Sequence, residues 1–147
     1  MGISDILTEE MILVDVEADN KRQLLEKISS FVAEKENLDK NAIFEAILER
    51  ENLGSTGYGS GVAFPHARIN GLQKIITAFA MASKGMDFDA IDGKPVDLIA
   101  FLISPEKSGE DHLQSLAILS RALKNENVCN EVRNSRTAHE IYLALNK

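Results

Sequence analysis

Residues 54–68 of the chain read Gly54-Ser55-Thr56-Gly57-Tyr58-Gly59-Ser60-Gly61-Val62-Ala63-Phe64-Pro65-His66-Ala67-Arg68. The glycines permit positive φ angles and let a second molecule approach the backbone closely. Pro65 fixes its own φ and favours an extended conformation at Phe64. The stretch therefore predicts a flexible loop followed by a stiff segment that displays His66, either as a reactive side chain or as part of an ordinary surface turn.

Two helices are predicted before this loop. Asp19 is a suitable N-cap for a helix over about residues 20–36, and Asp39 for a second helix that ends near Leu53 and Gly54. Further upstream, residues 3–9 could form a helical turn, and the β-branched residues of 11–16 predict a strand. Arg50 falls in the last turn of the second helix, where a cation is favoured by the helix dipole whether or not it has a function.

Three strands are predicted after the loop, over residues 62–64, 75–82 and 96–103. The second and third are nearly continuous apolar runs, which is typical of strands covered on both faces. Asp92-Gly93 predicts a turn between them.

The last third of the chain predicts helices. Ser108 with Asp111 resembles a capping box that opens a helix through about Lys124, and a second helix is expected over about residues 128–134. The buried face of the first of these is expected to hold Leu113, Leu116, Ala117 and Leu123. Thr137 and Glu140 predict a capping box for a terminal helix. We expect an α/β fold: one domain over residues 1–147, its core at about 5–145, with a mixed β-sheet flanked by helices on both faces.

Composition narrows the classes of function. The 147 residues are 44% hydrophobic and 27% charged with a net charge of −7, which disfavours nucleic-acid and anionic-membrane partners. The only cysteine, Cys129, allows no intramolecular disulfide, and no metal site or cofactor is predicted. No apolar run could span a bilayer and the first residues lack a basic segment, so we expect a cytoplasmic protein without membrane insertion.

The glycine loop does not match three common catalytic or binding motifs. It lacks the Gly-Lys-Ser/Thr of a P-loop, and it does not open a helix as a dinucleotide fingerprint does. The run from Gly57 to Gly61 also departs from the Gly-x-Ser-x-Gly elbow of serine hydrolases, because Ser60 is followed directly by glycine.

The histidines suggest phosphoryl transfer instead. His66 follows the loop, His112 lies at a predicted helix start where backbone N–H groups can bind an anion, and His139 is expected on the surface. A neutral imidazole can act as a covalent nucleophile, and the phosphoryl group it receives needs nearby cations and donors. Arg50 and Arg68 lie close to His66 in sequence.

The segments 54–57 and 61–66 resemble the active-site segment of enzyme IIA of the mannitol/fructose class of the bacterial phosphotransferase system. The resemblance continues through residues 88–98 and 112–116 and covers about residues 5–145. It implies that His66 accepts a phosphoryl group from the phosphocarrier HPr, forming tele-phosphohistidine, and that His112 and Arg50 are further active-site residues. We expect the phosphate- or partner-binding residues to be Ser55, Thr56, Gly57, Gly59, Gly61 and Arg68.

The resemblance favours the nitrogen-regulatory branch of this family, in which phosphorylation gates partner proteins. The alternative is a sugar-transport enzyme IIA that passes its phosphate to a cysteine of a separate enzyme IIB. The sequence alone does not choose the sugar, the regulated partner or the oligomeric state.

Overall fold

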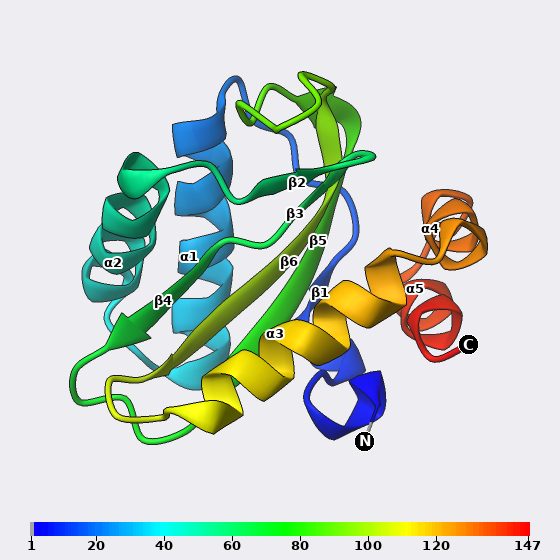
Figure 1. The fold of residues 1–147 in the computed structure, drawn as a ribbon. Coiled ribbons are helices and arrows are strands. Elements are labelled where there is room, and N and C mark those ends of the chain that lie inside the picture. Colours follow the sequence, from blue (N-terminus) through cyan, green and yellow to red (C-terminus); the bar gives the residue numbers. More distant parts are fainter. Residues whose placement is uncertain (1) are drawn as a thin grey trace.

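The computed structural model describes residues 2–147 and contains a mixed six-stranded sheet between helices (Figure 1). Its helices are α1 (Lys21–Glu36), α2 (Lys40–Leu53), α3 (Glu110–Leu123), α4 (Glu126–Arg133) and α5 (Ala138–Leu145), with short 3-10 helices η1 (Ile3–Asp5) and η2 (Glu9–Met11). Its strands are β1 (Ile12–Leu13), β2 (Gly57–Gly59), β3 (Val62–Ala63), β4 (His66–Ile69), β5 (Ile76–Met86) and β6 (Val96–Pro105).

Strands β5 and β6 form an antiparallel pair at the centre of the sheet. The strand order is β1-β5-β6-β3-β2, and β4 pairs with β6 beyond the end of β3. β1 is parallel to β5, while β3 and β4 are parallel to β6. The mixed sheet predicted from the sequence is therefore confirmed, and the long apolar runs are its two most buried strands.

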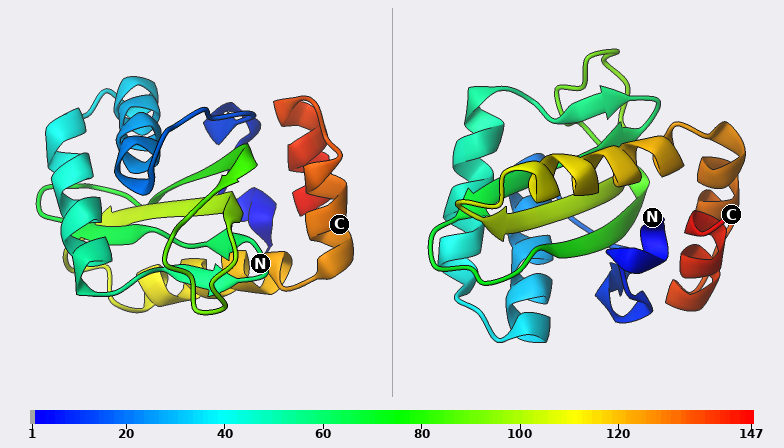
Figure 2. Two further views of the ribbon diagram at one scale, coloured as in Figure 1. Left: turned by 90° about the horizontal axis from the view of Figure 1, so that it is seen from above. Right: turned by 60° about the horizontal axis from the view of Figure 1, so that its bottom comes forward.

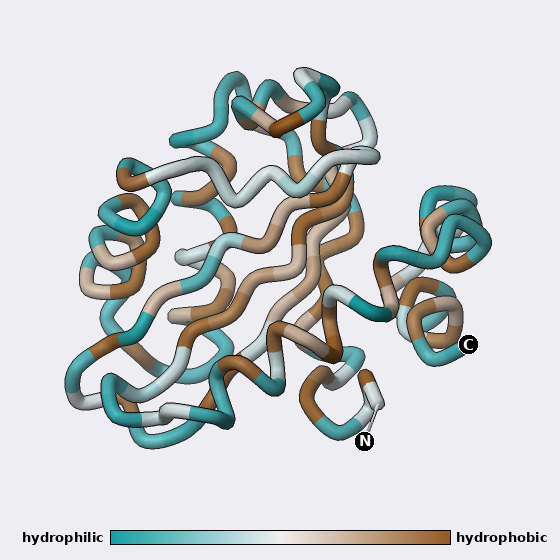
Figure 3. The backbone as a smooth tube through the Cα atoms, in the orientation of Figure 1, coloured by the Kyte–Doolittle hydropathy of each residue, from teal (hydrophilic) through white to brown (hydrophobic). Residues whose placement is uncertain are grey.

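Helices cover both faces of this sheet, as predicted. Helices α1 and α2 lie together on one face, and α3 crosses the other (Figure 2). Helices α4 and α5 stand beside the β1 side of the sheet, near both chain ends. The apolar residues concentrate in the central strands and on the inner sides of the helices (Figure 3), so the core lies on either side of β5 and β6.

Several predicted boundaries were wrong. The first strand is only Ile12–Leu13, because Met11 still belongs to a 3-10 helix. Asn20 rather than Asp19 caps α1, with its side chain accepting from the amide of Gln23. Strand β3 ends at Ala63 and is followed by β4, which was not predicted. Asp39 and Thr137 do cap α2 and α5 as expected.

The start and orientation of α3 also differ from the prediction. Its N-cap is Gly109, at φ 53°, and no side chain caps it, because the Asp111 amide binds the backbone oxygen of Ser108. Leu113 is 62% exposed, whereas His112 is only 2% exposed. The helix is thus rotated so that the histidine faces the sheet. Its buried residues are His112, Ser115, Ile118, Leu119 and Leu123.

Candidate functional site

His66 is the first residue of β4 and lies beside Leu102 of β6 in parallel register. The two residues before it are held on both sides: the amide of Phe64 donates to the carbonyl of Thr56 (3.1 Å), and the carbonyl of Pro65 accepts from the amide of Leu102 (3.0 Å). The half-buried imidazole therefore projects from a backbone fixed to the central sheet.

One hydrogen bond sets which ring nitrogen of His66 is free. Nδ1 lies 2.8 Å from the carbonyl oxygen of Phe64. A carbonyl only accepts, so Nδ1 carries the hydrogen, and in the neutral ring the lone pair is on Nε2. Burial lowers the pKa of His66, and the nearby Arg50 and Arg68 lower it further against the opposing effect of the Phe64 hydrogen bond. At neutral pH the ring is uncharged and Nε2 is available as a nucleophile.

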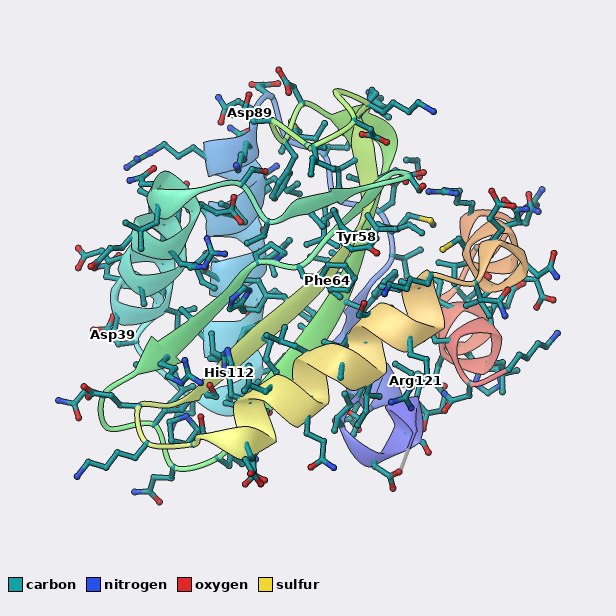
Figure 4. All side chains as sticks on the ribbon, in the orientation of Figure 1. Asp39, Tyr58, Phe64, Asp89, His112 and Arg121 are labelled. Atoms are coloured by element: carbon teal, nitrogen blue, oxygen red, sulfur yellow. The ribbon has the colours of Figure 1, made fainter. Side chains whose placement is uncertain are left out.

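The second histidine of the site reaches it from the opposite element. His112 projects from α3 towards the sheet (Figure 4), and its ring centroid lies 5.4 Å from that of His66. Burial, followed by the charges of Arg68 and His66, lowers the pKa of His112 to about 4. His112 is therefore neutral at physiological pH and offers one donor and one acceptor nitrogen.

Ser104 determines the tautomer of His112. This residue of β6 is fully buried, and its Oγ hydrogen-bonds Nδ1 of His112. Within residues 2–147 the hydroxyl has no other hydrogen-bond partner, and a buried O–H without an acceptor costs about 1–3 kcal/mol. The hydroxyl therefore donates to Nδ1, which places the ring hydrogen of His112 on Nε2. Sequence reasoning missed Ser104, whose only signal is a serine that ends the apolar run of residues 98–103.

Two arginines give the site its positive charge. Arg50 lies in the last turn of α2, and its Nη1 donates to the carbonyl of Gly54 (2.7 Å). It lines two hollows, one on each side of His66, which are described below. Arg68 is exposed and lies two residues after His66, so both side chains share one face of β4. Both arginines are thus placed near the imidazole, and both lower its pKa.

The start of the glycine loop forms one wall beside His66. The Ser55 hydroxyl accepts from the amide of Gly57 (2.9 Å) and donates to the carbonyl of Phe88. Gly57 is required by packing, because a Cβ there would lie 2.8 Å from Cα of Ala90. These contacts fix the loop against the segment between β5 and β6.

A buried carboxylate anchors the same wall and was not predicted. Glu51 is 6% exposed, and its side chain accepts from the Thr56 amide (3.2 Å) and the Thr56 hydroxyl. Its charge is paired with Lys21, at 2.7 Å. The same ammonium lies 4.5 Å from the centroid of the Phe88 ring and donates to the Phe88 carbonyl. An acidic residue near the end of a helix looks exposed in the sequence, which is why this network was missed.

Gly59, the last residue of β2, and Gly61, in the turn between β2 and β3, lie away from His66. Their φ angles are 118° and 82°, and Ser60 between them is at 57°. This turn contacts Arg133 of α4 and lines a different hollow. The structure therefore brings together His66, His112, both arginines and residues 55–57, but not these two glycines. His139 is also remote, since its Nδ1 pairs with Glu9 at 2.5 Å.

Two hollows flank His66, and both His66 and Arg50 line each of them. The smaller, of about 310 Å³, is lined by Ala46, Glu49, Arg50, Leu53, His66, Ala67, Arg68 and His112. The larger, of about 530 Å³, is lined by Arg50, Ser55, Thr56, Gly57, Tyr58, Phe64, His66, Asp89 and Ile91. Leu53 and Ile91, one in each lining, are 83% and 86% exposed, so the rim is apolar and uncovered.

Two properties of residues 2–147 concern metal binding and membranes. That range contains no group of three or more His, Cys, Asp or Glu side chains placed to hold a metal ion. None of its helices is both long enough and apolar enough to cross a membrane.

Comparison with known proteins identifies the family of the chain. The family model "Phosphoenolpyruvate-dependent sugar phosphotransferase system, EIIA 2" matches residues 5–147. A nitrogen regulatory protein of Bradyrhizobium diazoefficiens is 39% identical over 145 residues, covering 99% of this chain and 95% of the relative. The crystal structure of nitrogen regulatory protein IIA-Ntr from Neisseria meningitidis superposes with a TM-score of 0.90 at 34% identity, covering 97% and 98% of the two chains.

A more distant structure shares the fold. It is the enzyme IIA of the Escherichia coli mannitol system, solved in complex with phosphorylated enzyme IIB, with a TM-score of 0.81 at 20% identity over 95% of this chain and 96% of that one. With the family model matching nearly the whole chain, the protein belongs to the EIIA type 2 family of the phosphoenolpyruvate-dependent sugar phosphotransferase system.

Proposed function

We propose that Nε2 of His66 accepts a phosphoryl group from an HPr-type phosphocarrier and that the phosphorylated state serves chiefly as a regulatory signal. One observation carries the proposal: the Phe64 carbonyl occupies Nδ1, so the other ring nitrogen is left free between two hollows and beside two arginines. The nitrogen-regulatory relatives support the regulatory role.

The transfer step uses the lone pair on Nε2. This pair attacks the phosphorus of the donor's phosphohistidine, the donor P–N bond breaks, and its electron pair stays on the donor imidazole. The hydrogen on Nδ1 of His66 remains in place, and the Phe64 carbonyl stabilises the positive charge that the ring gains. No external base is needed, because the accepting nitrogen is already unprotonated.

The surrounding donors stabilise the phosphoryl group as it arrives. His112, with its hydrogen on Nε2, donates to a phosphoryl oxygen, and Arg50 and Arg68 supply positive charge. Ser55, Thr56 and Gly57 form the wall against which the group is held. Each charge-assisted hydrogen bond is worth about 1.5–3 kcal/mol, or roughly a tenfold to hundredfold effect on rate.

The apolar rim suits a protein partner. The exposed side chain of Leu53 lines the smaller hollow beside His66, and those of Tyr58 and Ile91 line the larger one. Exposed apolar side chains around a reactive group are typical of an interaction site. We assign this rim to the phosphocarrier and to whichever protein reads or receives the phosphate.

Transfer to an enzyme IIB cysteine is the second candidate. Its support is the solved complex of the mannitol enzyme IIA with phosphorylated enzyme IIB, which has the same fold. In that case a thiolate of the partner would attack the phosphorus, the bond between phosphorus and Nε2 would break, and its electron pair would return to Nε2.

The test is labelling from phosphoenolpyruvate through enzyme I and an HPr-type donor, with and without an enzyme IIB. We expect one phosphoryl group per chain, stable in alkali and lost in acid, and none in His66→Ala. Arg50→Ala and His112→Ala should label roughly tenfold to hundredfold more slowly. Full labelling of His66→Ala would refute the acceptor, whereas rapid loss of label to an enzyme IIB would favour the transport role.

A further inference from the structure

A third hollow, of about 590 Å³, lies at the far end of β2 and β3 from His66. Its wall is formed by the turn between these strands, the end of β5, the start of β6 with the two residues before it, the end of α3, and α4. Tyr58 is the only residue that it shares with the linings beside His66. Its volume falls within the range of small-molecule sites, roughly 300–1,000 Å³.

Positive charge without ion pairs is the main feature of this hollow. Lys84, Lys94 and Lys124 line it, and none of the three forms an ion pair with a carboxylate of residues 2–147. Glu126 is the one carboxylate of the wall that is free of an ion pair in that range. The chain as a whole has a net charge of −7, so a cationic hollow runs against its overall charge. Like charges gathered in a concave site raise the local potential and attract an anion.

The wall is held in place before any ligand arrives. Arg133 makes two hydrogen bonds to Asp97, of 2.8 and 2.9 Å, and a third to the carbonyl of Ser60 at 3.0 Å. These contacts tie α4 to β6 and to the β2–β3 turn. They also occupy the guanidinium fork, which could otherwise bind a carboxylate or a phosphate, so an incoming anion is left to the lysines.

We propose that this hollow binds a phosphate monoester with a small flat or apolar body, of which a nucleoside monophosphate is a simple example. Lysine ammonium groups bind phosphate as point charges, and three of them can each contact a different oxygen of a phosphate dianion, which offers more oxygens than a carboxylate does. The half-exposed ring of Tyr58, together with Pro95, supplies an apolar surface for the body, and the ammonium of Lys124 lies 5.6 Å from the centroid of that ring. The site is separate from His66 and does not depend on phosphotransfer.

The experiment is a titration of backbone amide spectra with adenosine monophosphate at constant ionic strength. We expect saturable shifts with a dissociation constant of roughly 1 mM or tighter, centred on residues 84–85, 94 and 124. The shifts should persist in His66→Ala. The triple variant Lys84→Gln/Lys94→Gln/Lys124→Gln should bind at least about tenfold more weakly, whereas Lys35→Gln/Lys40→Gln/Lys74→Gln, with the same change in net charge, should bind within about twofold of the parent.

Adenosine, inorganic phosphate and succinate separate the parts of the proposal. If adenosine binds as tightly as adenosine monophosphate, the phosphate does not contribute to binding. If inorganic phosphate binds as tightly as adenosine monophosphate, the nucleoside does not contribute. Equal affinity for succinate would contradict the preference for phosphate. Shifts that vanish in His66→Ala, equal losses in the two triple variants, or no saturable binding would each overturn the site. A failure of His66 labelling would refute the proposed function and leave this titration unaffected.

Discussion

Ser104 of β6 and His112 of α3 are joined by a buried hydrogen bond between Oγ and Nδ1. Ser104→Ala removes the donor that fixes the tautomer, so His112 should populate both neutral forms. Long-range proton–nitrogen spectra of the imidazole should then show a protonated Nδ1 fraction that the parent lacks. Because a neutral hydrogen bond is worth about 0.5–1.5 kcal/mol, acceptance of phosphate should slow roughly twofold to tenfold.

Ser115→Ala is the matched control for that variant, since Ser115 is also a buried serine and lies one turn along the same helix. It should leave the His112 spectrum unchanged. Ser104→Thr keeps the hydroxyl and should restore the parental tautomer. An unaltered spectrum in Ser104→Ala would assign the tautomer to some other group.

Stability should fall as the pH is lowered from 7 to 5. The pKa of His112 is about 4 in the folded protein against an ordinary 6.5, so the unfolded chain binds more protons between these values. This linkage corresponds to a loss of about 2 kcal/mol from His112 over that interval, and the lowered pKa of His66 acts in the same direction. Urea unfolding at the two pH values should show a smaller difference for His112→Gln. The exposed His139→Gln serves as the control, and an equal reduction in both variants would contradict this assignment.

Glu51→Gln should destabilise the protein by on the order of 2–3 kcal/mol, because it leaves the ammonium of Lys21 largely buried without its counter-charge. The exposed pair of Glu26 and Lys40 is the comparison, and Glu26→Gln should change stability by less than about 1 kcal/mol. Denaturant unfolding measures both. If adding Lys21→Met to Glu51→Gln recovers no stability, the cost does not arise from the unpaired lysine.

Gly61→Ala should cost more than Gly71→Ala. Both glycines have positive φ, 82° and 90°, so each substitution carries the left-handed penalty of about 1–2 kcal/mol. A Cβ at Gly61 would also lie 2.5 Å from Nη2 of Arg133, whereas nothing lies within 4 Å of one at Gly71. The difference between the losses of unfolding free energy in the two variants isolates the steric cost at Gly61. Equal losses would show that the turn and its neighbours make room for the Cβ freely.

Local patterns predicted the elements whose signals lie within a few residues. Asp39 and Thr137 were recognised as caps because a side-chain oxygen reaches an amide two or three residues on. The runs within β5 and β6 were recognised because central strands are apolar throughout. The pair Pro65-His66 could be recognised as the centre of the candidate site for the same reason, because the glycine loop and the proline that single it out directly precede the histidine.

Features that depend on packing were not predictable in this way. Helix α3 has apolar residues on two faces, and the face containing Leu113 looked as suitable for burial as the one containing Ile118. His112 is buried on the side of α3 that carries the core residues Ile118 and Leu119, and its contact with Ser104 exists only once β6 and α3 are packed together. Strand β4 alternates polar and apolar residues too briefly to stand out, and its pairing with β6 is a long-range parallel register.

In the proposed function, the hydrogen bond from Nδ1 of His66 to Phe64 also limits the order in which phosphoryl transfers can occur. With one open nitrogen, a phosphorylated chain cannot receive again until it has discharged, so any incoming and outgoing transfers must alternate in a ping-pong sequence. The amount of phosphate held can then never exceed the number of chains. At steady state the phosphorylated fraction of His66 would depend on the ratio of the phosphorylation rate to the dephosphorylation rate. A protein that binds only one of the two forms would therefore respond to that ratio.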